Sequence, residues 1–259
     1  MNKTLFAALF AACAFAAQAQ ASSTIRFGVD PTFAPYESVN AKGDLIGIDI
    51  DMGNAICKQL NAKCEWVKIN FDGAIPALNA QKIDGILSGM SITKQREKQV
   101  LFTIPFYSSA SLMMVPKKVT LDTTVASLKG KTIGIVQGTT QAAYANKHWK
   151  GKGIKLVSYQ NDNLAKQDLA LGRVDGTLQD SASAQSFFAT PEGKGFHLTG
   201  TPVNDAEVFG NGTGIGLRLA DHALKNKIDG AVKSMRKDGE FQKILARYSA
   251  YGLIGPTGQ

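Results

Sequence analysis

A short polar stretch in the first half of the chain carries residue types that bind anions in proteins. After the apolar run that ends at Leu87, the sequence reads Ser-Gly-Met-Ser-Ile-Thr-Lys-Gln-Arg, from Ser88 to Arg96. If a helix begins near Thr93, Arg96 lies in its first turn, where backbone N–H groups lack partners and attract anions. The guanidinium adds two parallel donors that match a carboxylate. The spacing indicates a carboxylate site, and an N-cap serine beside a surface arginine is the alternative.

Several sequence motifs of enzymes are incomplete in this chain. Gly130-Lys131-Thr132 resembles the end of a phosphate-binding loop, but Val125 replaces the glycine that such a loop needs five residues before its last glycine. The glycine-rich segment 210–216 lacks the spacing of a dinucleotide-binding fingerprint. No G-x-S-x-G motif occurs. We expect no catalytic residue, no cofactor and no metal site, and we expect three surface histidines, His148, His197 and His222.

The first 21 residues have the features of a secretory signal peptide. Lys3 supplies the positive start, an apolar run of roughly a dozen residues follows, and Ala-x-Ala patterns end at Ala19 and Ala21. The apolar run is shorter than the roughly 20 residues that a membrane-spanning helix needs. We expect cleavage after Ala19 or Ala21 and release into the periplasm. Lipidation at Cys13 is the alternative, although the apolar stretch continues past it.

Charge and cysteine content narrow the classes of partner. The chain has 29 lysines and arginines against 21 acidic residues, a formal net charge of +8. The lysines are scattered and form no arginine-rich or aromatic-interleaved patch, so we expect no binding to nucleic acid. In an exported chain, Cys57 and Cys64 meet an oxidising compartment, where a disulfide is expected. Two free buried thiols are the alternative.

Short β-like runs alternate with helix-like runs, which is typical of βαβ units and a mainly parallel sheet. Asp49 is placed to cap a helix, and Pro76 fits the first turn of another. The expected strands cover 25–29, 64–69, 83–87, 132–136, 154–158 and 174–178, and the expected helices cover 49–60, 74–80, 140–149, 161–171 and 181–189. Apolar residues spaced by three and four between Leu224 and Tyr248 predict a final pair of helices.

Two of the expected strands end in similar polar segments. Strand 25–29 runs into Asp-Pro-Thr-Phe, and strand 132–136 runs into Gln-Gly-Thr-Thr. Ligands of open α/β sheets bind beyond the carboxyl ends of the strands. Two such edges that face each other would form a cleft between two lobes.

Several motifs occur in one order over nearly the whole chain. They are Asp30-Pro31-Thr32-Phe33, Pro35-Tyr36-Glu37-Ser38, Gly47-Ile48-Asp49-Ile50-Asp51, the segment from Ser88 to Arg96, Gln137-Gly138-Thr139-Thr140-Gln141 and Gln179-Asp180. Together with the cysteine pair, they resemble the periplasmic amino-acid-binding proteins of ABC importers, solute-binding protein family 3. Within that family, the chain looks most like the lysine/arginine/ornithine-binding and histidine-binding proteins.

The resemblance implies an α/β, two-lobed periplasmic binding protein fold of type II, with two crossover hinge strands. We expect residues 22–109 and 213–259 to form lobe 1 and residues 110–212 to form lobe 2, with crossovers near Ala110-Ser111-Leu112 and Gly212-Thr213-Gly214. The resemblance also implies a monomer that closes over a free amino acid and delivers it to an inner-membrane ABC permease.

The resemblance further implies which residues hold the two charges of an amino acid. Arg96 is expected to hold the α-carboxylate, with help from the backbone amides of Ser91 and Thr140. Asp180 is expected to pair with the α-ammonium, beside the Ser91 hydroxyl and the Gly89 carbonyl. A buried, unpaired charge costs several kcal/mol, so a zwitterion that leaves water needs both partners.

Phe33 and Phe71 are expected to stack on the aliphatic or planar part of the ligand side chain, with a cation–π contribution. Asp30 is expected to face a distal positive charge, which favours arginine, lysine, ornithine or histidine and disfavours glutamate and aspartate. Glutamine, or another neutral polar amino acid, is the alternative. The remaining contacts are assigned to Ser88, Gln141 and Val136.

Two departures from the family pattern leave the ranking of basic ligands open. Gly89 stands where relatives often carry serine, and Phe33 stands where tyrosine is common. Each change removes a hydroxyl that can contribute about 0.5–1.5 kcal/mol. Two other classes fit the same fold: a periplasmic cyclohexadienyl-dehydratase-like enzyme, with Asp30 and Asp180 as its acid/base pair, and a ligand-sensing domain of a receptor.

Overall fold

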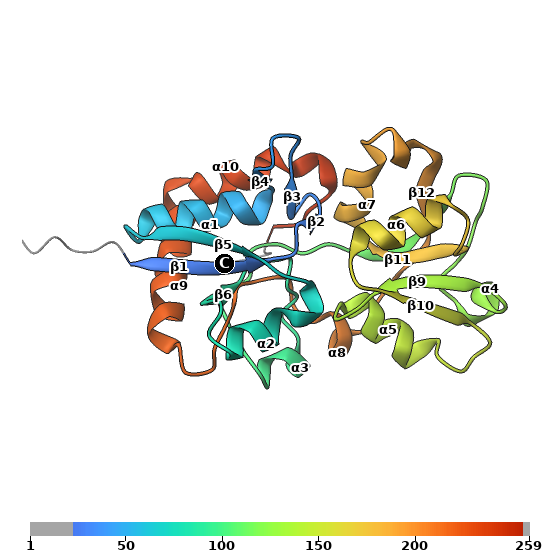
Figure 1. The fold of residues 1–259 in the computed structure, drawn as a ribbon, viewed down its shortest axis with the longest axis horizontal. Helices are drawn as coiled ribbons and strands as arrows, with labels where there is room; N and C mark the ends of the chain where they lie inside the picture. The colour runs from blue at the N-terminus through green and yellow to red at the C-terminus, as the bar shows by residue number, and fades with distance from the viewer. Residues whose placement is uncertain (1–22, 256–259) are drawn as a thin grey trace, which may run out of the picture.

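The structure is a computed structural model that describes residues 23–255. These residues form two lobes that lie side by side and are joined by extended chain (Figure 1). The expected signal peptide, including Cys13 and both expected cleavage positions, lies outside the described residues. Within residues 23–255, we find no helix whose length and apolar character would allow it to span a bilayer.

The sheet of lobe 1 has the strand order β5-β1-β6-β13-β7. Its strands are β1 (Thr24–Val29), β5 (Lys63–Lys68), β6 (Gly85–Ile86), β7 (Leu101–Phe102) and β13 (Gly216–Leu217). β1 pairs in parallel with β5 and β6, whereas β13 is antiparallel to β6 and β7. Four of these five strands therefore run in one direction, so the expected mainly parallel sheet is confirmed, and β13, which returns from the other lobe, is its antiparallel strand.

Apolar helix faces enclose this sheet. The helices are α1 (Ile48–Gln59), α2 (Ala74–Asn79), α9 (His222–Asp238) and α10 (Glu240–Arg247). α1, α9 and α10 share one core with β1, in which Phe27, Ile56 and Val232 are fully buried. α2 belongs to a second core with β6. The predicted final pair of helices is confirmed as α9 and α10.

The start of α1 differs from the prediction that Asp49 caps it. The N-cap is Gly47 with φ 135°, and Asp49 lies inside the first turn. A Cβ at residue 47 would lie 2.1 Å from the carbonyl oxygen of Tyr36, so only glycine fits where the helix begins. The buried Asp49 carboxylate instead accepts hydrogen bonds from the N–H of Gly89 at 2.6 Å and from the hydroxyl of Tyr107.

Short elements extend lobe 1 towards lobe 2 (Figure 1). They are the small sheet of β2 (Thr32–Phe33), β3 (Glu37–Val39) and β4 (Leu45–Ile46), and the short helices η1 (Phe71–Gly73) and α3 (Lys94–Glu97). β2, η1 and α3 follow β1, β5 and β6 along the chain. They therefore lie beyond the carboxyl ends of parallel strands, where open α/β sheets bind ligands.

Lobe 2 repeats this arrangement around a sheet of order β10-β9-β11-β8-β12. Its strands are β8 (Ser111–Pro116), β9 (Thr132–Val136), β10 (Lys155–Tyr159), β11 (Gly176–Asp180) and β12 (Phe196–Val203), and its helices are α4 (Val125–Leu128), α5 (Thr140–His148), α6 (Asp162–Ala170), α7 (Ser181–Phe188), η2 (Glu192–Gly195) and α8 (Ala206–Phe209). β9, β10 and β11 are parallel, and β8 is antiparallel to β11 and β12. The strand predicted at 132–136 coincides with β9, and the helices predicted in this lobe match α5, α6 and α7 within one residue at each end.

The two crossover segments between the lobes pair with each other. The N–H of Thr213 donates to the carbonyl of Tyr107 at 2.8 Å. The C-terminal segment joins the same place, because Ser108 and Ile254 exchange backbone hydrogen bonds of 2.8 and 2.9 Å, and η3 (Ser249–Tyr251) packs against α7. The membership of β8 and β13 in different sheets supports lobe boundaries at residues 110 and 213, which we retain as a proposal.

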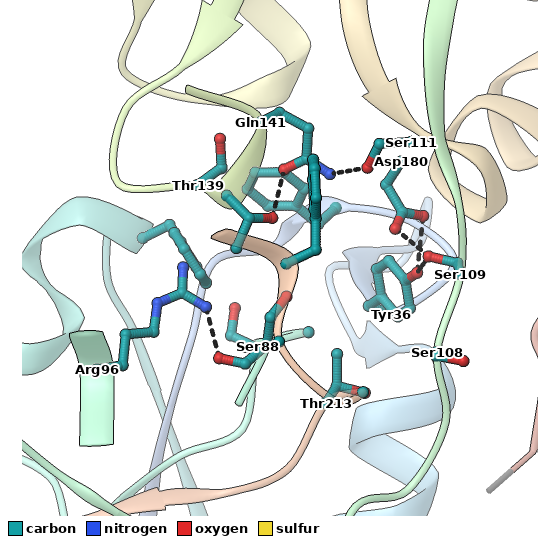
Figure 2. A pocket seen from close by; sticks show the side chains of 18 residues that line it. Tyr36, Ser88, Arg96, Ser108, Ser109, Ser111, Thr139, Gln141, Asp180 and Thr213 are labelled. Atoms are coloured by element: carbon teal, nitrogen blue, oxygen red, sulfur yellow. Dashed lines mark hydrogen bonds between the residues drawn. The ribbon is translucent and has the colours of Figure 1, made fainter. Parts of the chain in front are cut away.

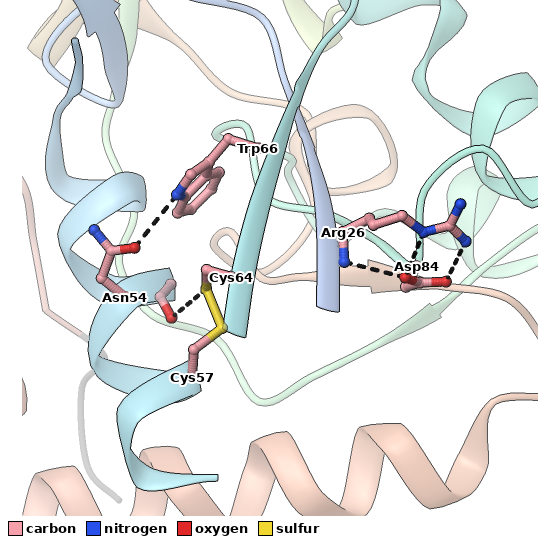
Figure 3. Close-up of a disulfide and its surroundings, with 7 residues drawn as sticks. Arg26, Asn54, Cys57, Cys64, Trp66 and Asp84 are labelled. Carbon is pink, nitrogen blue, oxygen red and sulfur yellow. Dashed lines mark hydrogen bonds and ion pairs between the residues drawn. A yellow bond between two sulfur atoms is a disulfide. The ribbon is translucent and has the colours of Figure 1, made fainter. Parts of the chain in front are cut away.

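A disulfide joins the end of α1 to the start of β5 (Figure 3). Cys57 and Cys64 are bonded, with 5.8 Å between their Cα atoms, so the bridged alternative is confirmed over two free thiols. Next to it, the indole N–H of Trp66 donates to Asn54 at 3.3 Å. The closed loop is short, so the chain-entropy model gives the disulfide roughly 2–3 kcal/mol.

Candidate functional site

A cavity lies between the lobes, beyond the carboxyl ends of both sets of parallel strands (Figure 2). Its volume is about 740 Å³ with the open mouth included. Arg96 and Asp180 are the charged residues that line it, and hydroxyl, aromatic and glycine residues form most of the rest. The lining residues are Phe33, Tyr36, Phe71, Ser88, Gly89, Ser91, Arg96, Ser108, Ser109, Ser111, Thr139, Thr140, Gln141, Asp180, Phe209, Gly210, Gly212 and Thr213.

Arg96 projects into the cavity from α3, whose N-cap Thr93 accepts a hydrogen bond from the Arg96 N–H at 3.2 Å. The guanidinium donates to the carbonyl of Ser91 at 2.8 Å and, across the cleft, to the carbonyl of Gly138 at 2.9 Å. Its carbon lies 5.4 Å from the centre of the Phe71 ring. Burial lowers the pKa of Arg96 to about 10, so the positive charge is held in a site poor in water and would be stabilised by an anion.

Two phenylalanines form an apolar wall of the cavity. Phe33 comes from β2 and Phe71 from η1, and their ring centres are 5.8 Å apart with planes inclined at 55°. The Phe71 ring also contacts the Arg96 guanidinium. The wall therefore offers apolar surface and ring faces directly beside the cationic group.

Asp180 approaches from lobe 2, at the end of β11, and also caps α7. Its Oδ1 accepts hydrogen bonds from the N–H groups of Ala182 at 3.0 Å and Ser183 at 3.1 Å. The Tyr36 hydroxyl donates to Oδ1 at 2.7 Å, and the Ser109 hydroxyl donates to Oδ2. Burial raises the pKa of Asp180 above its usual value, and the hydrogen bonds partly offset this. A cation in the cavity would favour the ionised carboxylate.

Amide and hydroxyl groups of lobe 2 lie at the start of α5. The N-cap Thr139 accepts from the N–H of Ala142 at 3.1 Å. Gln141 donates to the Ser111 hydroxyl at 2.9 Å, and the Thr140 hydroxyl donates to Gln141 at 3.2 Å (Figure 2). The first N–H groups of a helix have no partner within it, so this helix end adds donors to the side of the cavity opposite α3.

Two buried carboxyl groups support the floor of the cavity from below. Glu37 and Asp49 are fully buried. The Ser88 hydroxyl donates to Glu37 Oε1 at 2.6 Å, and the Gly89 N–H donates to Asp49 at 2.6 Å. Burial, followed by the proximity of Asp49, raises the pKa of Glu37 well above its usual range; burial raises the pKa of Asp49 to about 6. Two neighbouring carboxyl groups without a positive partner do not both ionise readily, so one of them keeps its proton. Glu37 is that group, because its pKa is raised further than the pKa of Asp49.

Nine of the eleven residues predicted to bind ligand line this one cavity, and Asp30 and Val136 do not. Asp30 is 1% exposed; Oδ1 accepts from the N–H and hydroxyl of Thr32, and Oδ2 accepts from the N–H of Phe71. Val136 is buried, and its carbonyl accepts the Thr139 hydroxyl at 2.7 Å. Both residues accept hydrogen bonds from protein donors here, and their contacts with a ligand stay predictions.

Several lining residues were missed by the sequence reasoning. Tyr36 belongs to the motif Pro35-Tyr36-Glu37-Ser38, which supports the family resemblance but does not indicate that the Tyr36 hydroxyl reaches the other lobe. The remainder sit on or beside the crossovers or at the helix α5 cap: Ser108, Ser109, Ser111, Thr139, Phe209, Gly210, Gly212 and Thr213. The one sequence feature that could have predicted some of them is the group of serines next to the expected crossover, Ser108, Ser109 and Ser111.

The cavity matches a small molecule that carries one anionic and one cationic group. Arg96 and Asp180 lie on different sides of it, with hydroxyls between them (Figure 2). Each side chain is buried enough for an opposite charge to be favourable there. Among residues 23–255, no group of three or more His, Cys, Asp or Glu side chains could hold a metal ion.

Comparison with known proteins gives a consistent set of matches. The family model described as bacterial extracellular solute-binding proteins, family 3, matches residues 25–251. The lysine/arginine/ornithine-binding periplasmic protein of Escherichia coli K12 is 43% identical over 90% of this chain and 90% of its own. The histidine-binding periplasmic protein of Salmonella typhimurium LT2 is 43% identical over 95% of this chain and 94% of its own.

A solved structure shares the two-lobed fold. An ancestral arginine-binding protein bound to arginine superposes with a TM-score of 0.81 and 34% sequence identity, covering 87% of this chain and 98% of that one. The similarity therefore extends over most of both chains.

Proposed function

This chain belongs to the bacterial extracellular solute-binding proteins, family 3, and we propose that it captures a free L-amino acid with a cationic side chain between its lobes. The curated relatives that support this ligand class are named for lysine, arginine, ornithine and histidine. We further propose that the protein acts in the periplasm after loss of its signal peptide, as a monomer, and delivers its ligand to an inner-membrane ABC permease without chemical change.

The observation that carries the proposal is the pair Arg96 and Asp180 at a single cavity. Arg96 would bind the α-carboxylate, because its planar donors match two carboxylate oxygens and burial strengthens the interaction. The N–H groups at the start of α5, near Thr140, would add donors from lobe 2. Asp180 would bind the α-ammonium. Both charges of the zwitterion would then be paired as the lobes close around it.

The ligand side chain would lie along Phe33 and Phe71. Their ring centres are 5.8 Å apart, so the two rings form one continuous apolar surface that supports this placement. Cationic side chains interact favourably with aromatic faces, by about 0.5–2 kcal/mol. Asp30 lies behind this wall and bonds to the N–H of Phe71. We propose that it favours a cationic ligand through its charge and through its hold on Phe71, with or without direct contact.

A neutral polar amino acid such as glutamine is the second candidate. The observation that favours it is that Asp180 is the one carboxylate among the lining residues, so no second carboxylate faces a distal charge. The hydroxyls of Ser88, Ser111 and Thr213 would serve an amide as well as a guanidinium.

Isothermal titration calorimetry of the purified protein distinguishes these candidates. The titrants are L-arginine, L-lysine, L-ornithine, L-histidine and L-glutamine, with L-glutamate and D-arginine as controls, after bound ligand has been removed by unfolding and refolding. We expect a basic L-amino acid to bind tightest and glutamate to bind at least a hundredfold more weakly. Tightest binding of glutamine would support the second candidate. Failure of every amino acid to bind would refute both.

A further inference from the structure

Three oxygen-bearing side chains from different parts of the molecule meet at one side of the cavity (Figure 2). Tyr36 belongs to lobe 1, Ser109 to the crossover and Asp180 to lobe 2. The Tyr36 hydroxyl lies 2.7 Å from Asp180 Oδ1 and 3.0 Å from the Ser109 hydroxyl, which itself bonds to Asp180 Oδ2. The contact therefore links both lobes and the segment between them through protein atoms alone.

The Tyr36 ring is held firmly on the lobe 1 side. It is 4% exposed and stacks on Tyr107, with ring centres 5.4 Å apart and planes inclined at 15°. The Tyr107 hydroxyl donates to the buried Asp49. Gly89 also lies against the Tyr36 ring, since a Cβ there would be in ordinary van der Waals contact with it at 3.4 Å. The phenol is thus presented to lobe 2 in a fixed position.

The acceptor is equally fixed on the lobe 2 side. Asp180 Oδ1 already accepts the N–H groups of Ala182 and Ser183 at the start of α7, which orient the carboxylate. Each hydroxyl has one proton, and both protons of the Tyr36–Ser109 pair are directed at Asp180. Oδ1 is then fully used by protein donors, and Oδ2 keeps room for one more donor.

We propose that Tyr36, assisted by Ser109, is a latch that holds the lobes together and leaves Asp180 Oδ2 as the position for the ligand ammonium. Tyr36 and Ser109 are positioning residues in this scheme. The latch contributes to closure whatever occupies the cavity, because its partners are protein groups. Only its effect on ligand affinity rests on the proposed function.

The test replaces the hydroxyl and leaves the ring. In Tyr36→Phe, the bond to Asp180 is lost while stacking on Tyr107 is kept. Hydrogen bonds to charged groups contribute enough to shift an equilibrium about ten- to a hundredfold. We expect the ratio of closed to open molecules to fall by that factor, and Ser109→Ala to lower it as well. Fluorescent labels at two exposed positions, introduced as Lys82→Cys and Lys152→Cys, report the separation of the lobes in single molecules.

Tyr159→Phe is the matched control. Tyr159 is also a buried tyrosine whose hydroxyl donates to a carboxylate, Asp168, at 2.8 Å, but both residues belong to lobe 2. We expect this variant to lower the free energy of unfolding without changing the ratio of closed to open molecules. An equal shift in both tyrosine variants would overturn the latch, since it would show a general loss of stability.

The label measurement is made without amino acid and then with saturating L-arginine, and affinity is measured by calorimetry. We expect Tyr36→Phe to open the protein without arginine and to weaken arginine binding. A wild-type protein with no detectable closed molecules before arginine is added would overturn the proposal, as would an unchanged closed fraction in Tyr36→Phe. If no amino acid binds the wild type, the proposed function fails, while the measurement without arginine still decides the latch.

Discussion

Replacement of Arg96 by methionine is expected to weaken ligand binding strongly while it changes the stability of the ligand-free protein little. Burial lowers the pKa of the guanidinium to about 10, and at about 1.4 kcal/mol per pKa unit its charge costs the folded state on the order of 3 kcal/mol. Hydrogen bonds to the carbonyls of Ser91 and Gly138 offset this cost, at about 1.5 kcal/mol or more each. The contributions nearly cancel, so Arg96→Met should change the free energy of unfolding of the ligand-free protein by no more than about 1 kcal/mol.

The same substitution should nearly abolish ligand binding. A buried carboxylate that loses its charged partner is destabilised by about 3–5 kcal/mol, which corresponds to a hundredfold to several thousandfold in affinity. Urea unfolding of the ligand-free protein gives the stability, and calorimetry with L-arginine gives the affinity. Stability lower by more than about 2 kcal/mol, or affinity lower by less than tenfold, would refute this reasoning.

A control arginine should behave in the opposite way. Arg218 lies in lobe 1 away from the cavity, donates to the carbonyl of Ile83 at 2.7 Å, and forms ion pairs with Asp84 at 3.3 Å and Asp221 at 2.8 Å. Because these partners are permanent protein groups, Arg218→Met should lower the free energy of unfolding and leave the affinity for arginine unchanged.

Three further predictions concern residues around the cavity. Asp30→Asn should reduce the preference for arginine over glutamine about tenfold in calorimetry, with smaller loss for glutamine, and an unchanged ranking would contradict the role given to Asp30. Because burial raises the pKa of Asp49 and Glu37, the folded state binds protons more tightly than the unfolded state. The free energy of unfolding, measured with urea, should therefore fall as the pH rises from about 4 through about 6, and Glu37→Gln should make this fall less steep. Gly138→Ala should hinder closure and weaken binding at least tenfold, because a Cβ there would lie 2.9 Å from the Cα of Asp72 in the other lobe and φ is 76°; unchanged scattering profiles with arginine would argue against this.

The sequence predicted the elements whose signals are local. β9 coincides with its prediction because a β-branched run lies between polar segments, and Arg96 reaches the cavity because Thr93 caps a short helix as expected. The assignment of most lining residues came from the resemblance and not from spacing, since spacing alone does not bring Arg96 and Asp180 to the same cavity.

The failures share a different physical origin. Asp49 looks like a helix cap, but the buried Gly89 N–H and Tyr107 hydroxyl, both distant in sequence, take its carboxylate. The carboxylate of Asp30 accepts the N–H of Phe71 inside lobe 1, a contact that local sequence signals do not predict, and its role towards a ligand stays a prediction. The hydroxyl of Tyr36 meets its partner only when the lobes are together. In each case a contact distant in sequence decides where a polar group points.

The pairing of Ser108 with Ile254 places the last described residues beside the crossover segments, about which we expect the lobes to rotate, and not at the outer end of either lobe. Displacement in a rotation grows with distance from its axis. A fluorophore or surface tether attached at Ile254 would therefore stay nearly still during closing. One attached at Thr24, the end of β1 that lies away from lobe 2, would move through a wide arc and report the motion (Figure 1).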